Sequence, residues 1–192
     1  MTTKTKEKPA AEKTNLKQPM MVTPTGVAAY AWLTKPDTAF GQEKFKLTIL
    51  LEKNKENDAF VESVRKIHDA HRGTSKNVGP VKDGDKTGKD GQEGHWLIEA
   101  KSNYQPKLID TERQEITNER EVPMSGDLVK MAFKAHPYEA GPNAGISLVL
   151  NAVQLVEKRN AGVGIAAVFP DVQGFVASEQ TEKSAAEAPF DF

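Results

Sequence analysis

The 192-residue sequence has no cysteine, and this absence excludes disulfides, thiolate zinc sites and cysteine nucleophiles. No apolar run approaches the roughly 20 residues that a membrane-spanning helix needs. The N-terminal stretch MTTKTKEKPAAEKTNLK carries charge but no apolar region, so it does not have the pattern of a secretory signal. These absences predict a protein without a membrane segment that is compatible with a reducing compartment.

Catalytic and metal-binding motifs are also missing. In GDKTGKD only three residues separate Gly84 from Gly88, and an aspartate follows Lys89, so a phosphate-binding P-loop is excluded. His68 and His71 lie three residues apart without a third ligand at metal-binding spacing, and we expect one packed and one solvated histidine. The serines and histidines form neither a nucleophile elbow nor an HExxH pattern. We therefore predict no enzymatic activity, no cofactor and no metal site.

The net charge of −1 conceals an uneven distribution of charge along the chain. Residues 1–17 carry five lysines against two glutamates, whereas residues 171–192 carry five acidic residues against one lysine. The body between them has twenty basic and twenty acidic residues. We predict a disordered basic arm over 1–17, a folded domain over 18–170 and a flexible acidic tail over 171–192. The asymmetry indicates a polyanionic partner, and it indicates that the acidic tail competes with this partner for the basic residues of the chain.

Alternation of apolar and polar residues predicts the strands. The clearest case is EKFKLTILLEK, and HWLIEAKSNY, GDLVKMAFKAHPY and AGISLVLNAVQLVEK alternate in the same way. The first ordered stretch, PMMVTPTGVAAYAWLTKPD, also reads as a strand. We expect its apolar face to carry Val27, Ala29, Ala31 and Leu33, and its other face Tyr30 and Trp32.

The segments between these strands have other patterns. NKENDAFVESVRKIHDAHRG places Phe60, Val64 and Ile67 at helical spacing and ends at Gly73, which predicts a helix. The stretch 78–94 is rich in glycine and charge and predicts a long mobile loop. About five strands and one helix, without a parallel β-α-β rhythm, predict a mainly β fold. The architecture that fits is a five-stranded oligonucleotide/oligosaccharide-binding (OB) barrel with disordered tails.

The polar strand faces have two interpretations. Lysines on several strands either converge on one groove and bind phosphates, or simply solvate the outside of a sheet. Exposed aromatics among those lysines favour single-stranded nucleic acid, because stacking contributes roughly 1–3 kcal/mol per base. Tyr30 and Trp32 face away from the apolar side of their strand, and Tyr104 and Tyr138 lie at strand ends beside lysines. In contrast, Phe45, Phe133 and Trp96 alternate with aliphatic residues, and we assign them to the core.

Six segments in order resemble the single-stranded DNA-binding proteins of tailed phages. They are YAWLTKPD, FKLTILL, FVESVRKIHDAH, HWLIEAKS, GDLVKMAFKAHPY and GISLVLNAVQLVEK, and the chain closes with an aspartate-phenylalanine end. One feature departs from an OB barrel, which usually places its helix after the third strand. Here the helix follows the second recognised strand, so either Met20–Leu33 forms two strands bent at Gly26, or the strand count is wrong.

The resemblance implies a non-enzymatic protein of phage replication or recombination, located in the host bacterial cytoplasm, that binds single strands without strong sequence preference. It implies a tail whose tip contacts the phage DNA polymerase and helicase-primase, and a homodimer is possible. An RNA-binding or scaffold β-barrel module with a docking tail remains the alternative. The DNA-facing candidates are Tyr30, Trp32, Lys44, Lys46, Lys101, Tyr104, Lys107, Lys130, Lys134 and Tyr138. The partner-binding candidates are Phe190, Asp191 and Phe192.

Overall fold

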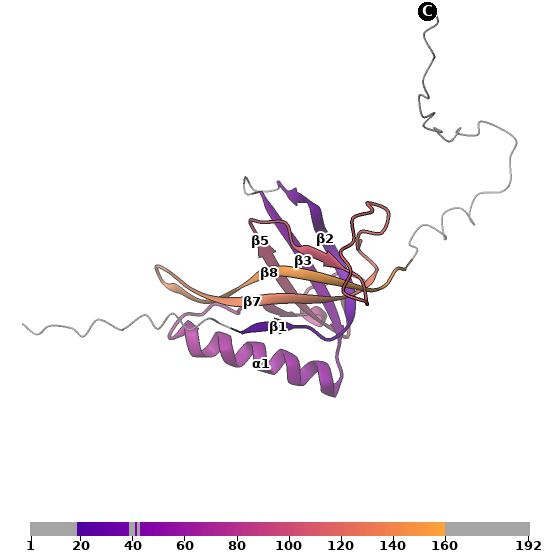
Figure 1. Cartoon of the computed structure of the whole chain (residues 1–192). Coiled ribbons are helices and arrows are strands. Elements are labelled where there is room, and N and C mark those ends of the chain that lie inside the picture. The colour runs from indigo at the N-terminus through magenta and orange to yellow at the C-terminus, as the bar shows by residue number, and fades with distance from the viewer. Residues whose placement is uncertain (1–18, 39–40, 42, 160–192) are drawn as a thin grey trace, which may run out of the picture. The chain divides into compact units, whose positions relative to one another are not determined.

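The computed structural model describes residues 19–38, 41 and 43–159, so the predicted arm and acidic tail lie outside the described residues (Figure 1). Within the described ranges, no helix is both long and apolar enough to cross a bilayer. The strands are β1 (Met20–Val22), β2 (Gly26–Asp37), β3 (Lys44–Glu52), β4 (Val81–Asp83), β5 (His95–Ser102), β6 (Lys107–Ile109), β7 (Leu128–Ala140) and β8 (Asn143–Glu157). The helices are α1 (Lys55–Arg72) and the short 3₁₀ helix η2 (Gly84–Lys86).

Five strands close into a ring. β7 pairs with β2, β2 with β3, β3 with β5, and β5 with β8, and β8 then pairs with β7 along most of its length. The β5–β8 pairing is parallel and the other four are antiparallel. The short strands β1, β4 and β6 extend the sheet beside β7, β5 and β8. The predicted five-stranded barrel is therefore confirmed.

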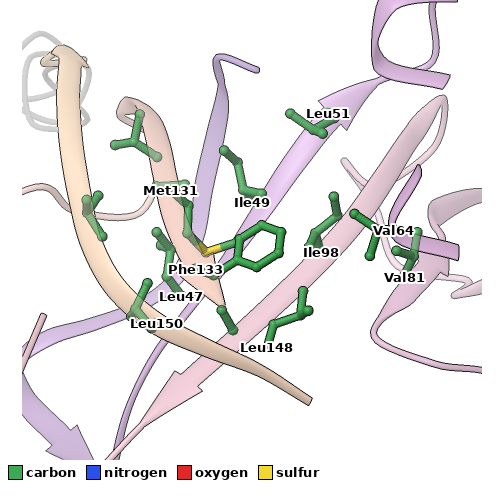
Figure 2. Close-up of a cluster of buried hydrophobic side chains, with 14 of the residues drawn as sticks. Leu47, Ile49, Leu51, Val64, Val81, Ile98, Met131, Phe133, Leu148 and Leu150 are labelled. Carbon is green, nitrogen blue, oxygen red and sulfur yellow. The ribbon is translucent and has the colours of Figure 1, made fainter. Parts of the chain in front are cut away.

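The core fills the interior of this ring and has the composition that the alternation predicts. Leu47 and Ile49 of β3, Ile98 of β5, and Met131 and Phe133 of β7 point toward one another (Figure 2). Each of them is completely buried, and burial of such a side chain contributes about 1.5–3 kcal/mol. The apolar face expected for β7 is therefore confirmed, and that of β3 is confirmed from Leu47 onward. Phe45 and Trp96, which we assigned to the core, are only half-buried.

Helix α1 begins after Asn54 and ends before Gly73. The Asn54 side chain caps the helix by accepting a hydrogen bond of 2.9 Å from the Asn57 amide, and the helix stops before Gly73, which has a φ of 54°. Val61 and Val64 on one face are buried, and the helix packs against β8 and, to a smaller extent, β4 and β7. The predicted helix is confirmed.

Of the two explanations for the early helix, the one in which Met20–Leu33 forms two strands is only partly correct. The stretch from Met20 does form two strands, and the second begins at Gly26. A Cβ on Gly26 would lie 2.4 Å from the Leu50 carbonyl oxygen, so the close approach of β2 to β3 requires glycine. However, β1 lies outside the ring, and within the ring the helix still follows the second strand, β3.

The predicted even alternation along β2 is wrong. Ala29 pairs with Thr48 and Trp32 with Lys46, so β2 has one extra residue relative to β3 at this point. The resulting β-bulge places Tyr30 at a φ of 49°. The buried side chains of the strand are therefore those of Ala28 and Leu33, which are five positions apart, whereas Ala29 is only half-buried.

The segment 78–94, predicted as a long loop, contains secondary structure and internal contacts. Val81–Asp83 pairs with β5, and η2 follows directly. The Lys53 ammonium lies 2.5 Å from a carboxylate oxygen of both Asp83 and Asp85, and the Gly94 amide donates to Asp85 at 2.6 Å. These hydrogen bonds raise the pKa of Lys53 and lower the pKa of both carboxyls. These contacts could not be predicted from the sequence of the segment, because their partner Lys53 is some thirty residues away in the chain.

Candidate nucleic-acid interface

A row of side chains crosses three strands on the outside of the barrel. Trp32 on β2 pairs with Lys46 on β3, and Lys46 pairs with Lys101 on β5. Directly opposite residues of antiparallel strands share a face, with Cβ atoms about 4.5–5.5 Å apart. Because Leu47 and Ala100, their neighbours along the strands, point into the core, this row lies on the outer face.

Lysines from three strands meet in a groove of about 530 Å³ on this outer face. Lys44 comes from β3, Lys82 from β4 and Lys101 from β5. Glu99 also lines the groove, and its carboxylate lies 2.8 Å from the Lys101 ammonium. Both side chains of this pair remain partly exposed, so water screens their attraction. The groove therefore has net positive charge, as phosphate binding requires.

Two tyrosines border the same groove. Tyr104 follows β5 and is 83% exposed, so a ring face is open to solvent. Tyr138 comes from the far end of β7 and is half-buried. Four of the ten predicted DNA-facing residues thus line one groove, namely Lys44, Lys101, Tyr104 and Tyr138.

A buried histidine holds one wall of the groove. The Ile146 amide donates to His68 Nδ1 at 3.3 Å, so the neutral ring carries its proton on Nε2, which lies 3.1 Å from the Asn77 carbonyl oxygen. The Asn77 side chain in turn hydrogen-bonds the Tyr138 hydroxyl. A Cβ on Gly145 would lie 2.4 Å from the His68 ring, so glycine lets the β8 backbone approach it. The expectation of a packed histidine is confirmed, but its link to the groove was not foreseen.

Tyr30 and Trp32 lie on the outer face but do not line this groove. They are 47% and 42% exposed, which confirms that neither belongs to the core. The Tyr30 hydroxyl accepts a hydrogen bond of 3.3 Å from the Gln92 side chain. The Lys89 ammonium lies 5.4 Å from the centroid of the Tyr30 ring, within cation–π distance. The loop before β5 therefore already contacts one of the predicted stacking rings.

Four predicted lysines lie elsewhere. Lys46 is ion-paired with Asp37, and both side chains are largely buried. Lys107 is on β6, while Lys130 and Lys134 are on β7, and none of them lines the groove. Lys134 nevertheless continues the outer row, because it pairs with Val149 of β8, and Val149 pairs with Lys101.

Lys82 lines the groove but was not among the residues predicted from the sequence. The glycines around it indicated a loop, although Val81 and Lys82 alternate in burial as they would in a strand. Its neighbour across the sheet is Leu97, which lies on the same outer face as Lys101. A short edge strand of three residues carries too weak a pattern to be recognised without its partner.

The closed ring and the lysine-rich outer groove define an OB-fold protein of the oligonucleotide-binding class. Residues 21–181 match the family described as the single-stranded DNA-binding protein of Enterobacter phage Enc34. The chain therefore belongs to this family of phage single-stranded DNA-binding proteins. The class is not enzymatic, and this confirms the expectation from the sequence. No curated protein matches the sequence.

Solved phage proteins have a similar fold. One is the single-stranded DNA-binding protein from bacteriophage Enc34 in complex with ssDNA, with a TM-score of 0.61, 22% identity, and coverage of 73% of this chain and 88% of that chain. Another is gp2.5, the single-stranded DNA-binding protein encoded by bacteriophage T7, with a TM-score of 0.57, 19% identity, and coverage of 84% and 100%. At these identities the similarity establishes a shared fold.

Proposed function

We propose that this protein binds single-stranded DNA without strong sequence preference during phage replication or recombination, in the cytoplasm of the bacterial host. The observation that supports this most directly is the groove in which Lys44, Lys82 and Lys101 lie beside the exposed ring of Tyr104. Membership of the phage family supports the same choice of ligand.

The chemistry of the groove explains both the affinity and the lack of sequence preference. Lysine ammonium groups bind the phosphates, and phosphate contacts position a strand without reading its sequence. Tyr104 supplies a stacking surface of roughly 1–3 kcal/mol per base, and every base has a π-face that fits it. Duplex DNA keeps its bases stacked on one another and offers no free base to this ring. The groove therefore favours single strands over duplexes.

The salt dependence of binding tests this mechanism. If three to five phosphates are neutralised, the logarithm of the association constant falls with the logarithm of the salt concentration with a slope of about −2 to −3.5. Fluorescence titrations with single-stranded DNA, duplex DNA and RNA of equal length measure the slope and the preference together. A slope near zero, or tighter binding of the duplex, would contradict the proposal. Tighter binding of RNA would instead favour the RNA-binding alternative.

We further propose that Phe190, Asp191 and Phe192 form a tip that binds the phage DNA polymerase and helicase-primase. These residues lie outside the described part of the chain, and the proposal is supported by the sequence of the tail. The region 171–192 carries five acidic residues against one lysine, so it is electrostatically suited to the same lysines that bind phosphate. We propose separately that the protein associates into a homodimer.

Deletion of 179–192 tests the role of the tail. We expect the shortened protein to bind single-stranded DNA more tightly at low salt, because the deletion removes four of the five acidic residues of 171–192. We also expect it to lose its interaction with the polymerase and the helicase-primase in pull-down assays. A matched variant with Phe190 and Phe192 changed to alanine keeps the acidic charge and separates the two effects. Unchanged DNA affinity together with unchanged partner binding in the deletion would refute the proposal.

A further inference from the structure

A second, smaller cavity of about 260 Å³ adjoins the groove. Asn77 and Pro80 line both of them, so only the short segment 77–80 separates the two. The C-terminal half of α1 forms much of the lining of the second cavity. Its charged residues are Arg65, Asp69, Arg72 and Lys76, which are three cations and one carboxylate.

The three cations of the second cavity differ in how firmly neighbouring side chains hold them. The Arg65 guanidinium lies 4.4 Å from the centroid of the Trp96 ring, which orients it. Arg72 Nε lies 2.7 Å from an Asp69 carboxylate oxygen, and both side chains are about half exposed, so this pair is screened by water. Lys76 is exposed. The C-terminal end of a helix carries about half a negative charge, which is smaller than the net charge of these side chains. The cavity therefore attracts anions.

The segment between the cavities presents no charge to a strand that crosses it. The Gly79 amide donates to the Asn77 side chain at 3.1 Å, and the Asn77 backbone amide donates to the Ser75 hydroxyl oxygen at 3.2 Å, so hydrogen bonds within the segment hold the turn. A Cβ on Gly79 would lie 2.9 Å from the His68 ring, and its φ of 83° also favours glycine. At the crest of the segment, Val78 is 83% exposed. A nucleobase passing over it meets an apolar contact and no carboxylate.

We propose that the second cavity binds phosphates of the same single strand after it leaves the groove, with Arg72 and Lys76 as the principal contacts. The proposal rests on the proposed function of the groove and extends it. The bound strand then runs from the outer face of β3 and β5, over Val78, to the C-terminal end of α1. This path makes the contribution of the second cavity depend on the length of the strand.

Oligonucleotide length separates the two sites experimentally. The variant R72A/K76A is compared with K55A/K66A, which removes two exposed lysines of the same helix that line neither cavity. The ligands are oligo(dT) of about 6 and about 16 nucleotides, near the two ends of the range of roughly 4–16 that one OB barrel covers. We expect R72A/K76A to bind the longer ligand about 10-fold more weakly, with a salt slope shallower by about 1.4 because two phosphate contacts are lost. Its affinity for the shorter ligand changes less than about twofold, and the control changes neither value.

Each of the other outcomes refutes the proposed second site, and one of them also refutes the proposed function. If the unmodified protein binds neither ligand, both the proposed function and this extension are refuted. If it binds both ligands and R72A/K76A binds the longer one unchanged, only the extension is refuted. An equal loss for both lengths also refutes the extension, because the site would then lie within the path of the shortest strand. Thermal unfolding followed by circular dichroism verifies that each variant is folded.

Discussion

Replacing Lys44, Lys82 and Lys101 by glutamate in one variant is expected to weaken binding of single-stranded DNA by at least about 100-fold at low salt. The change removes three ammonium groups that line the groove and places three carboxylates opposite the phosphates. The salt dependence should lose about 2 units of slope for the three missing contacts, at about 0.7 each. Fluorescence anisotropy with labelled oligo(dT) at several salt concentrations measures both quantities.

A control of equal charge distinguishes the groove from the net charge of the protein. Lys55 and Lys66 on α1 and Arg120 in the connection between β6 and β7 are exposed and line neither cavity. Their triple replacement by glutamate changes the net charge by the same amount, and we expect an affinity within about threefold of the unmodified protein. Similar losses in the two variants would show that binding follows net charge, and the groove would then not be the binding site.

Phe133→Ala is expected to lower the free energy of unfolding by about 3–5 kcal/mol. Phe133 is completely buried at the centre of the barrel, and its ring makes an edge-to-face contact with Phe60 at 6.4 Å between centroids. Truncation leaves a cavity lined by residues of β7, β3 and α1, and the ring of strands cannot collapse to fill it without losing its pairing. Because small domains have a total stability of about 5–15 kcal/mol, denaturant unfolding will show a large shift of the midpoint.

Tyr104→Ala is the matched control for this loss of an aromatic ring. Tyr104 is 83% exposed, so its removal is expected to change the stability by less than about 0.5 kcal/mol. The Phe133→Ala variant keeps an intact outer face under conditions in which it is still folded. We therefore expect the affinity of this variant for single-stranded DNA to stay within a few-fold of that of the unmodified protein. A stability loss below about 1 kcal/mol for Phe133→Ala would contradict the central position of this ring in the core.

Much of the barrel is predictable from local sequence because strand and helix periods are local properties. In β3, Leu47 and Ile49 alternate with Lys46 and Thr48, and one set points into the core as expected. The period of α1 likewise identifies its buried face. In β2 the same reasoning fails, because the bulge at Tyr30 arises from the register against β3, and nothing within the strand itself announces the extra residue.

The candidate site is only partly predictable for the same reason. Alternation places Lys44, Lys46 and Lys101 on polar faces, and it treats them alike. The structure separates them: Lys46 is neutralised by Asp37, whereas Lys44 and Lys101 join Lys82 in the groove. Which lysines meet depends on the pairing of β3, β4 and β5, and these strands are joined across long stretches of chain.

The sequence by itself determined the mainly β class, the apolar and polar face of most strands, the single long helix and the family resemblance. All of these follow from the order and period of neighbouring residues. The tertiary structure alone decided the closure of the ring, the position of the bulge, the packing of His68 between Gly79 and Gly145, and the choice of lysines that line the groove. Such features depend on contacts between residues far apart in the chain, for which local period carries no information.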